Sequence, residues 1–186
     1  MTDGCRRAII TAIGGMSKIS AIVYTSNSGY TAEYARMLGE LTGLPVNDLR
    51  QVHNPQPQRE VIFLGWIMAD NVMGYAKASR FYKVRAVCQV GMGPATQAAS
   101  DKLRQKLKLG PEVQVFTLQG GFDIRRLHGP YKWIMQVKCR EIRRTLESRE
   151  SMSPAQRLTY DMVVKGTSAV KRDSLTDIVN WYKTTR

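Results

Sequence analysis

The chain has 186 residues, of which 43% are hydrophobic and 23% are charged, a composition typical of one globular domain with a sizeable core. No apolar run reaches the length of about 18 residues that a membrane-spanning helix needs. The three cysteines and the two histidines are widely spaced, which excludes a disulfide framework and disfavours a metal site. We therefore expect a cytoplasmic protein without a structural metal.

The formal net charge of +13 is the compositional oddity. The last 67 residues hold 14 basic and 7 acidic side chains, so about a third of the chain supplies +7. Such a surface attracts polyanions, anionic lipids or acidic proteins. The charge does not distinguish these partners, and a basic surface without a special partner also stays open.

The first residues predict a leader rather than part of the fold. The apolar stretch from Ala8 to Ile13 is too short for a secretory signal and ends at Gly14 and Gly15. We expect residues 1–17 to be a disordered leader, and residues 18–186 to form a single domain whose last part, residues 153–186, is a helical extension.

Strand and helix patterns then alternate along the chain. Short, apolar, β-branched runs predict five buried strands at Ile19–Tyr24, Val46–Leu49, Val61–Leu64, Val84–Val90 and Val113–Leu118. Helical spacing predicts helices at Ala32–Thr42, Asn71–Tyr82 and Thr96–Lys108, the first ending at Gly43. This order is typical of a parallel sheet with helices on both faces. Ligands bind such sheets beyond the carboxyl ends of the strands.

Beyond Gly121, apolar residues from Tyr131 to Leu146 share one helical face, and five Lys or Arg residues occupy the rest. This helix is either the last helix of the fold, with its apolar face on the sheet, or a basic surface that meets an anionic membrane. Ser153 and Pro154 predict the start of another helix. Asp173 or Ser174 is expected to cap a final one.

The segment Thr25–Thr31, between the first strand and the first helix, is rich in hydroxyls and lacks Lys and Arg. Hydroxyls, backbone N–H groups and a helix N-terminus together can hold a phosphate, and Gly29 permits close approach. No G-x-x-x-x-G-K-[ST] run occurs, which disfavours a nucleoside triphosphate loop. A polar helix-capping turn explains the same residues equally well.

The run Ser26-Asn27-Ser28-Gly29-Tyr30-Thr31 resembles the flavodoxin signature [ST]-x-[ST]-G-x-T. The resemblance implies an α/β, flavodoxin-like, doubly wound five-stranded parallel sheet of order 2-1-3-4-5 that binds flavin mononucleotide (FMN). By position, Ser26, Ser28, Gly29 and Thr31 would bind the FMN phosphate, while Asn27 and Tyr30 would offer backbone amides.

The same resemblance implies two loops beside the flavin ring. Trp66 would stack on the ring with Ile67 beside it, although Trp66 stands where the family often has proline; a partly buried surface tryptophan is the alternative. The backbone of Gly91, Met92 and Gly93 would meet the polar edge of the flavin.

The segment Leu118–Asp123, with Leu127, Tyr131 and Lys132, looks like the flavodoxin-like subgroup that contains menaquinone-dependent protoporphyrinogen oxidases. This resemblance implies an FMN-dependent oxidoreductase with a quinone or another redox partner, in peripheral contact with the inner face of an anionic membrane. The alternatives are an electron-transfer protein and a non-catalytic module that binds an anionic surface. Nucleic acid is not expected, because aromatics are sparse among the basic residues. No catalytic residue is identified.

Overall fold

The structure is a computed structural model that describes residues 19–185. The predicted leader, residues 1–17, lies outside the described residues.

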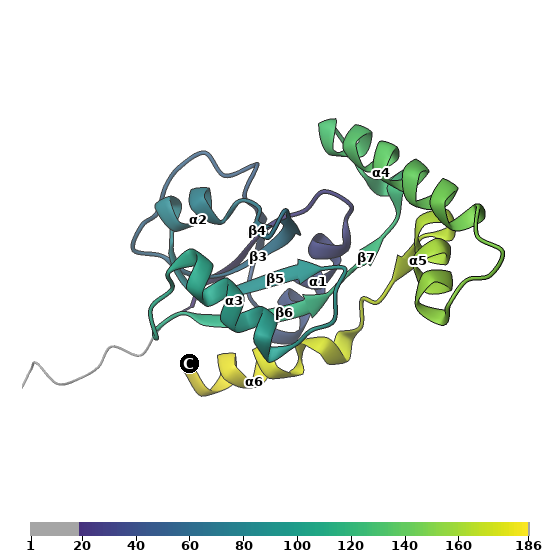
Figure 1. Cartoon of the computed structure of the whole chain (residues 1–186). Coiled ribbons are helices and arrows are strands. Elements are labelled where there is room, and N and C mark those ends of the chain that lie inside the picture. Colours follow the sequence, from purple (N-terminus) through teal and green to yellow (C-terminus); the bar gives the residue numbers. More distant parts are fainter. Residues whose placement is uncertain (1–18, 186) are drawn as a thin grey trace, which may run out of the picture.

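Five parallel strands form the centre of an α/β fold (Figure 1). They run side by side in the order β2 (Val46–Asp48), β1 (Ala21–Thr25), β3 (Glu60–Met68), β5 (Lys83–Gly91) and β6 (Gln114–Gln119). This is the predicted order of the five strands. A sixth strand that the sequence analysis did not expect, β4 (Asn71–Val72), pairs antiparallel with the end of β3.

Helices cover both faces of the sheet. On one face, α1 (Tyr30–Thr42) and α6 (Thr176–Thr185) bury side chains such as Tyr34, Leu38 and Ile178. On the other face, α2 (Tyr75–Phe81) and α3 (Gln97–Leu107) pack against the sheet through Ala78 and Leu103. The central strands are continuously apolar because both of their faces are buried.

The first crossover follows its sequence signals closely. Helix α1 begins after Gly29, which has a φ of 92°, and ends at Gly43, which has a φ of 72° and donates its N–H to the Gly39 carbonyl. Glycine adopts this left-handed backbone without the steric cost that a side chain adds.

Strand β3 corrects two predictions. It continues past Gly65 to Met68, turns at Ala69 and Asp70, and folds back as β4. A Cβ at position 65 would lie 2.4 Å from Cγ1 of Val72, so Gly65 lets the returning chain lie close instead of ending the strand. The helix predicted from Asn71 therefore begins only at Tyr75.

The longest helix does not cover the sheet. After β7 (Gly121–Phe122) and the 3₁₀ turn η1 (Ile124–Arg126), α4 (Pro130–Glu147) pairs with α5 (Pro154–Lys165), and the chain returns through β8 (Thr167–Ser168). We call residues 123–166 the helical arm, which projects from one end of the sheet (Figure 1). Its own small core contains Leu127 and Cys139, with Phe122 at its root.

The interpretation of α4 as the last helix of the sheet is therefore wrong, because α6 takes that place. An amphipathic pattern shows that a helix has an apolar face, but not which surface covers that face. The two residues predicted to cap the last helix, Asp173 and Ser174, lie within the 3₁₀ turn η2 (Arg172–Leu175). Helix α6 begins directly after this turn, at Thr176. The described part of the predicted extension, residues 153–185, is divided between the arm and the sheet.

The predicted start of α5 is confirmed. Ser153 is its N-cap, and Pro154 occupies the first turn. The Ser153 hydroxyl accepts from the Gln156 N–H at 3.3 Å, while the Gln156 side chain accepts from the Ser153 N–H at 2.9 Å. This reciprocal pair satisfies two N–H groups that a helix start leaves free.

Candidate functional site

A largely apolar pocket of about 230 Å³ lies where the carboxyl ends of the central strands meet the helical arm. The sheet side is formed by the ends of β3 and β5 and by the turn after β1. The arm side is formed by Asp123 and Leu127, which flank η1, and by the first turns of α4. Seven of the eleven predicted site residues line it: Ser28, Tyr30, Thr31, Trp66, Ile67, Gly91 and Met92.

The other four predicted residues lie beside the pocket and not in its wall. Ser26, Asn27 and Gly29 belong to the turn that precedes α1. Gly93 lines a neighbouring hollow that shares Ile67 and Gly91 with the main pocket. The three predicted segments therefore converge on one place, at the edge of the sheet where parallel α/β folds bind ligands.

The turn before α1 is held in shape by its own side chains. The Gly29 N–H donates to the Ser26 hydroxyl at 3.1 Å, and the Thr25 hydroxyl donates to the Met73 carbonyl at 2.5 Å. Tyr30 and Thr31 are buried, and the Tyr30 hydroxyl donates to the Thr167 carbonyl at 3.1 Å. The turn is thus preformed, with the N-terminus of α1 directly behind it.

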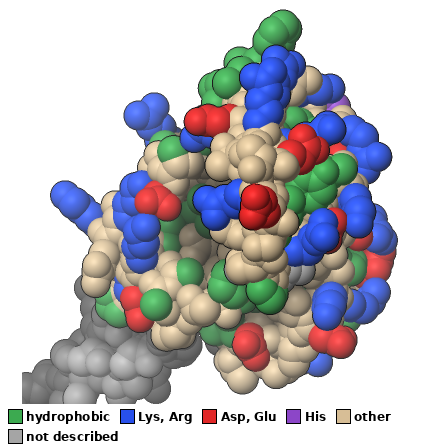
Figure 2. Space-filling view, turned by 45° about the vertical axis from the view of Figure 1, so that its right-hand side comes forward, with side chains coloured by type: hydrophobic (Ala, Val, Ile, Leu, Met, Phe, Trp, Pro, Cys, Tyr) green, Lys and Arg blue, Asp and Glu red, His purple; other side chains and the backbone are tan. Residues whose placement is uncertain are grey.

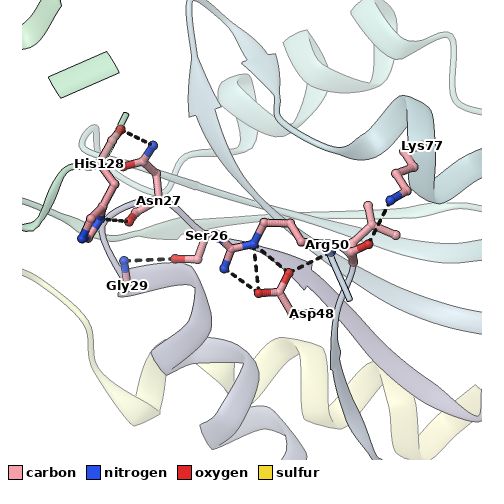
Figure 3. A network of polar contacts seen from close by, with 8 residues as sticks. Ser26, Asn27, Gly29, Asp48, Arg50, Lys77 and His128 are labelled. Atoms are coloured by element: carbon pink, nitrogen blue, oxygen red, sulfur yellow. Dashed lines mark hydrogen bonds and ion pairs between the residues drawn. The ribbon is translucent and has the colours of Figure 1, made fainter. Parts of the chain in front are cut away.

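Asn27 fixes the turn to the helical arm (Figure 3). Its amide oxygen accepts from the His128 N–H at 2.9 Å, and its amide nitrogen donates to the His128 carbonyl at 3.3 Å. The His128 Nδ1 lies 3.2 Å from the Asn27 carbonyl oxygen. These partners are 101 positions apart, so no local sequence pattern could pair them.

Arg126 brings a positive charge to a turn that has none of its own. Its guanidinium carbon lies 4.2 Å from the centre of the Tyr30 ring. Its Nη2 lies 2.8 Å from the position that a Cβ on Gly29 would occupy. The sequence analysis missed this residue, because η1 reaches the turn only through the folded arm.

An aromatic pair connects the two sides of the pocket. The rings of Trp66 and Tyr131 meet edge to face, with centroids 5.3 Å apart and an interplanar angle of 78°. Trp66 lies in β3 and not in the predicted loop, because the strand continues through Gly65. The arm adds Leu127, Ile134 and Met135 to the apolar lining, none of which the sequence analysis proposed as a site residue.

The carboxylate that lines the pocket is engaged in an ion pair. Asp123 accepts from the Arg125 N–H, Nε and Nη2, each at 2.9 Å. Hydrogen bonds from the Arg125 side chain lower the Asp123 pKa, so this group is ionised near neutral pH. It is therefore a structural anion at the base of the arm and not a free general base.

A second ion pair lies on the other side of the turn (Figure 3). Arg50 donates through Nε to Asp48 at 3.0 Å. Burial alone would raise the Asp48 pKa, but the hydrogen bonds from Arg50 outweigh burial and lower it overall. Lys77 donates to the Leu49 carbonyl at 3.2 Å. These contacts fix the chain after β2, and none of these residues lines the pocket.

The arrangement suits a ligand with a planar apolar part and an anionic end. The pocket offers aromatic and aliphatic surface, whereas the turn offers hydroxyls, a helix N-terminus and the Arg126 guanidinium. Within residues 19–185, no group of three or more His, Cys, Asp or Glu side chains could hold a metal ion. In that same range, no helix is both long and apolar enough to cross a membrane.

In comparisons with known proteins, no family model and no curated protein matches the chain.

Proposed function

We propose that the chain is an FMN-binding oxidoreductase with a flavodoxin-like fold. One observation carries the proposal. The hydroxyl-rich turn that resembles the flavodoxin phosphate signature opens directly into an apolar pocket that Trp66, Gly91 and Met92 also line. The strand order β2-β1-β3-β5-β6 is compatible with such a fold.

The residues of the turn would hold the phosphate end of FMN. The hydroxyls of Ser26, Ser28 and Thr31 and the N–H groups at the start of α1 are the donors. Trp66 and Tyr131 would contact the flavin ring, and the arm residues above them would exclude water from it. The bound flavin supplies the electron transfer, while the protein binds, orients and shields it.

The surface of the helical arm supports the proposal that the protein has a membrane-borne or anionic partner. Trp133 and Val137 on α4 are 75% and 64% exposed, and basic residues surround them on the same helix. Figure 2 shows Lys and Arg side chains spread over this side of the molecule, with hydrophobic side chains among them. Such a surface suits anionic lipid. It favours a quinone acceptor and a carboxylate-bearing, protoporphyrinogen-like substrate over a soluble electron carrier.

Titration with FMN tests the proposed function. The purified protein is expected to quench FMN fluorescence at micromolar concentration and to shift the visible absorption bands of the flavin, because a flavin in an apolar pocket leaves water. A colourless protein that leaves FMN fluorescence unquenched would overturn the proposal.

A matched pair of serine variants locates the bound phosphate. Ser28→Ala removes a hydroxyl of the turn and should weaken FMN binding about tenfold, because a hydrogen bond to a charged group contributes about 1.5–3 kcal/mol. Ser79→Ala is the control, since the Ser79 hydroxyl on α2 donates to the Ala76 carbonyl. If the two variants bound FMN with equal affinity, the assignment of the phosphate to the turn would be wrong.

A further inference from the structure

One arginine of the helical arm lies over the turn to which we assign the FMN phosphate. The Arg126 guanidinium contacts the face of the Tyr30 ring and approaches the Gly29 backbone. Tyr30 is the first residue of α1. The guanidinium therefore lies at the positive end of a helix, a place that disfavours a cation unless an anion is bound there.

Arg126 differs from its neighbour in what its side chain does. Arg125 is engaged with the Asp123 carboxylate and with the Lys165 carbonyl, to which it donates at 3.0 Å. No carboxylate of residues 19–185 lies within ion-pair distance of Arg126, although the Arg126 charge helps to lower the pKa of nearby Asp123. Its described contact is with an aromatic face, which leaves the N–H donors of the guanidinium available to a ligand.

The backbone on both sides of Arg126 is fixed, and the contact with the Tyr30 ring places its guanidinium over the turn. The Arg126 N–H donates to the Asp123 carbonyl at 3.0 Å. Leu127 is buried, and His128 is hydrogen-bonded to Asn27 of the turn. A phosphate in the turn would consequently meet a guanidinium that the helical arm holds over the turn, without a large movement of the chain.

We propose that Arg126 is the specificity residue that pairs with the ligand phosphate and makes the site select FMN over riboflavin. This inference rests on the proposed function and assigns the selectivity of that same site. Guanidinium and phosphate form two parallel charge-assisted hydrogen bonds, which are among the strongest polar contacts in proteins. Riboflavin has the same ring system but no phosphate, so Arg126 gains nothing from it.

Titration of both flavins into wild-type protein and Arg126→Gln tests the inference. By fluorescence quenching, the variant is expected to bind FMN at least about tenfold more weakly, because it loses a charge-assisted pair. Its affinity for riboflavin should stay within about twofold of wild type. Arg126→Lys should restore part of the FMN affinity, since lysine keeps the charge but lacks the planar fork.

Lys138→Gln is the matched control, because it removes one exposed charge of α4 that does not line the pocket. It should change neither affinity, and thermal melting should show that all variants are folded. Wild-type FMN affinity in Arg126→Gln would overturn the inference and leave the proposed function standing. An equal loss of affinity for FMN and for riboflavin would overturn the inference too, because it would show that Arg126 only stabilises the structure of the turn. If the wild-type protein binds neither flavin, the proposed function fails, and this inference fails with it.

Discussion

At Gly29 a backbone requirement and a close approach coincide. The residue has a φ of 92°, where a side chain is strained, and a Cβ there would lie only 2.8 Å from Nη2 of Arg126. The sequence suggested that the space beside Gly29 was left for a ligand. In the structure a cation of the arm uses part of that space, so glycine here serves the contact between arm and turn.

Gly29→Ala and Gly43→Ala separate these two roles. Both glycines have a positive φ, so each substitution should lower the free energy of unfolding by about 1–2 kcal/mol. Only Gly29→Ala should also displace Arg126 and weaken FMN binding, by about tenfold, because nothing lies within 4 Å of a Cβ at Gly43. Urea unfolding and FMN titration measure the two effects. Equal FMN affinity in both variants would contradict this assignment.

At the scale of elements, the base of the helical arm depends on an acid-sensitive contact. Hydrogen bonds from Arg125 lower the Asp123 pKa below its ordinary value of 3.8. A carboxyl whose pKa is lower in the folded state stabilises that state fully above its unfolded pKa, here above about pH 4. The contribution is lost as the pH falls through the lowered pKa. The arm should therefore lose part of its attachment in acid.

Asp123→Asn tests this attachment. It should lower the free energy of unfolding at pH 7 and reduce the loss that wild type shows between pH 7 and pH 3, because asparagine does not titrate there. Asp161→Asn is the control, since Asp161 forms an ion pair with Lys165 four positions further along α5. Urea unfolding at the two pH values is the measurement. A pH dependence identical to that of wild type in Asp123→Asn would exclude the contact as its source.

Features that depend on interactions between residues close in sequence could be predicted, whereas those that depend on residues far apart could not. The five parallel strands could be predicted because burial on both faces leaves continuous apolar runs, and α1 because Gly29 and Gly43 lie at its ends. The β3–β4 hairpin was missed, because Gly65 suggested a strand end and was in fact a place of close packing. Local patterns report the conformation of a segment more directly than the surface it packs against.

The same limit applies to the candidate site. The turn, Trp66 and the Gly91 segment could be proposed from sequence because each follows a predicted strand and the resemblance to flavodoxins implies a role for it. The contributions of Arg126 and His128 to the turn and of Tyr131 to the pocket could not, since these residues come from an arm whose packing no periodicity specifies. Sequence analysis therefore identified one side of the pocket and missed the other.

At the scale of the whole molecule, the arm combines charge with exposed apolar side chains. Glu147 joins its two helices, because its carboxylate accepts from the Tyr160 hydroxyl at 2.9 Å and from Arg143 Nε at 2.8 Å. The pair can therefore present a defined surface. Trp133 and Val137 are the most exposed large apolar side chains of the described arm, and we expect them to insert between lipid headgroups.

Sedimentation with vesicles tests the membrane partner. The protein is expected to sediment with anionic vesicles at about 20 mM salt and to dissociate at about 500 mM, because salt screens charge attraction. Neutral vesicles should bind much less. The double variant Trp133→Ser and Val137→Ser keeps the charge and should bind anionic vesicles several-fold more weakly. Leu41→Ser on α1 is the control. A lack of sedimentation with anionic vesicles at low salt would refute the membrane partner.

The short pairing of β7 with β8 has a consequence for how this chain can vary. Gly121 lies opposite Ser168, and Phe122 lies opposite Thr167. The chain therefore enters the helical arm and returns from it through two segments that lie side by side. The entropy of closing a loop rises only slowly with its length. The segment between Phe122 and Thr167 could lengthen, shorten or be exchanged for another while the register of every central strand stayed the same.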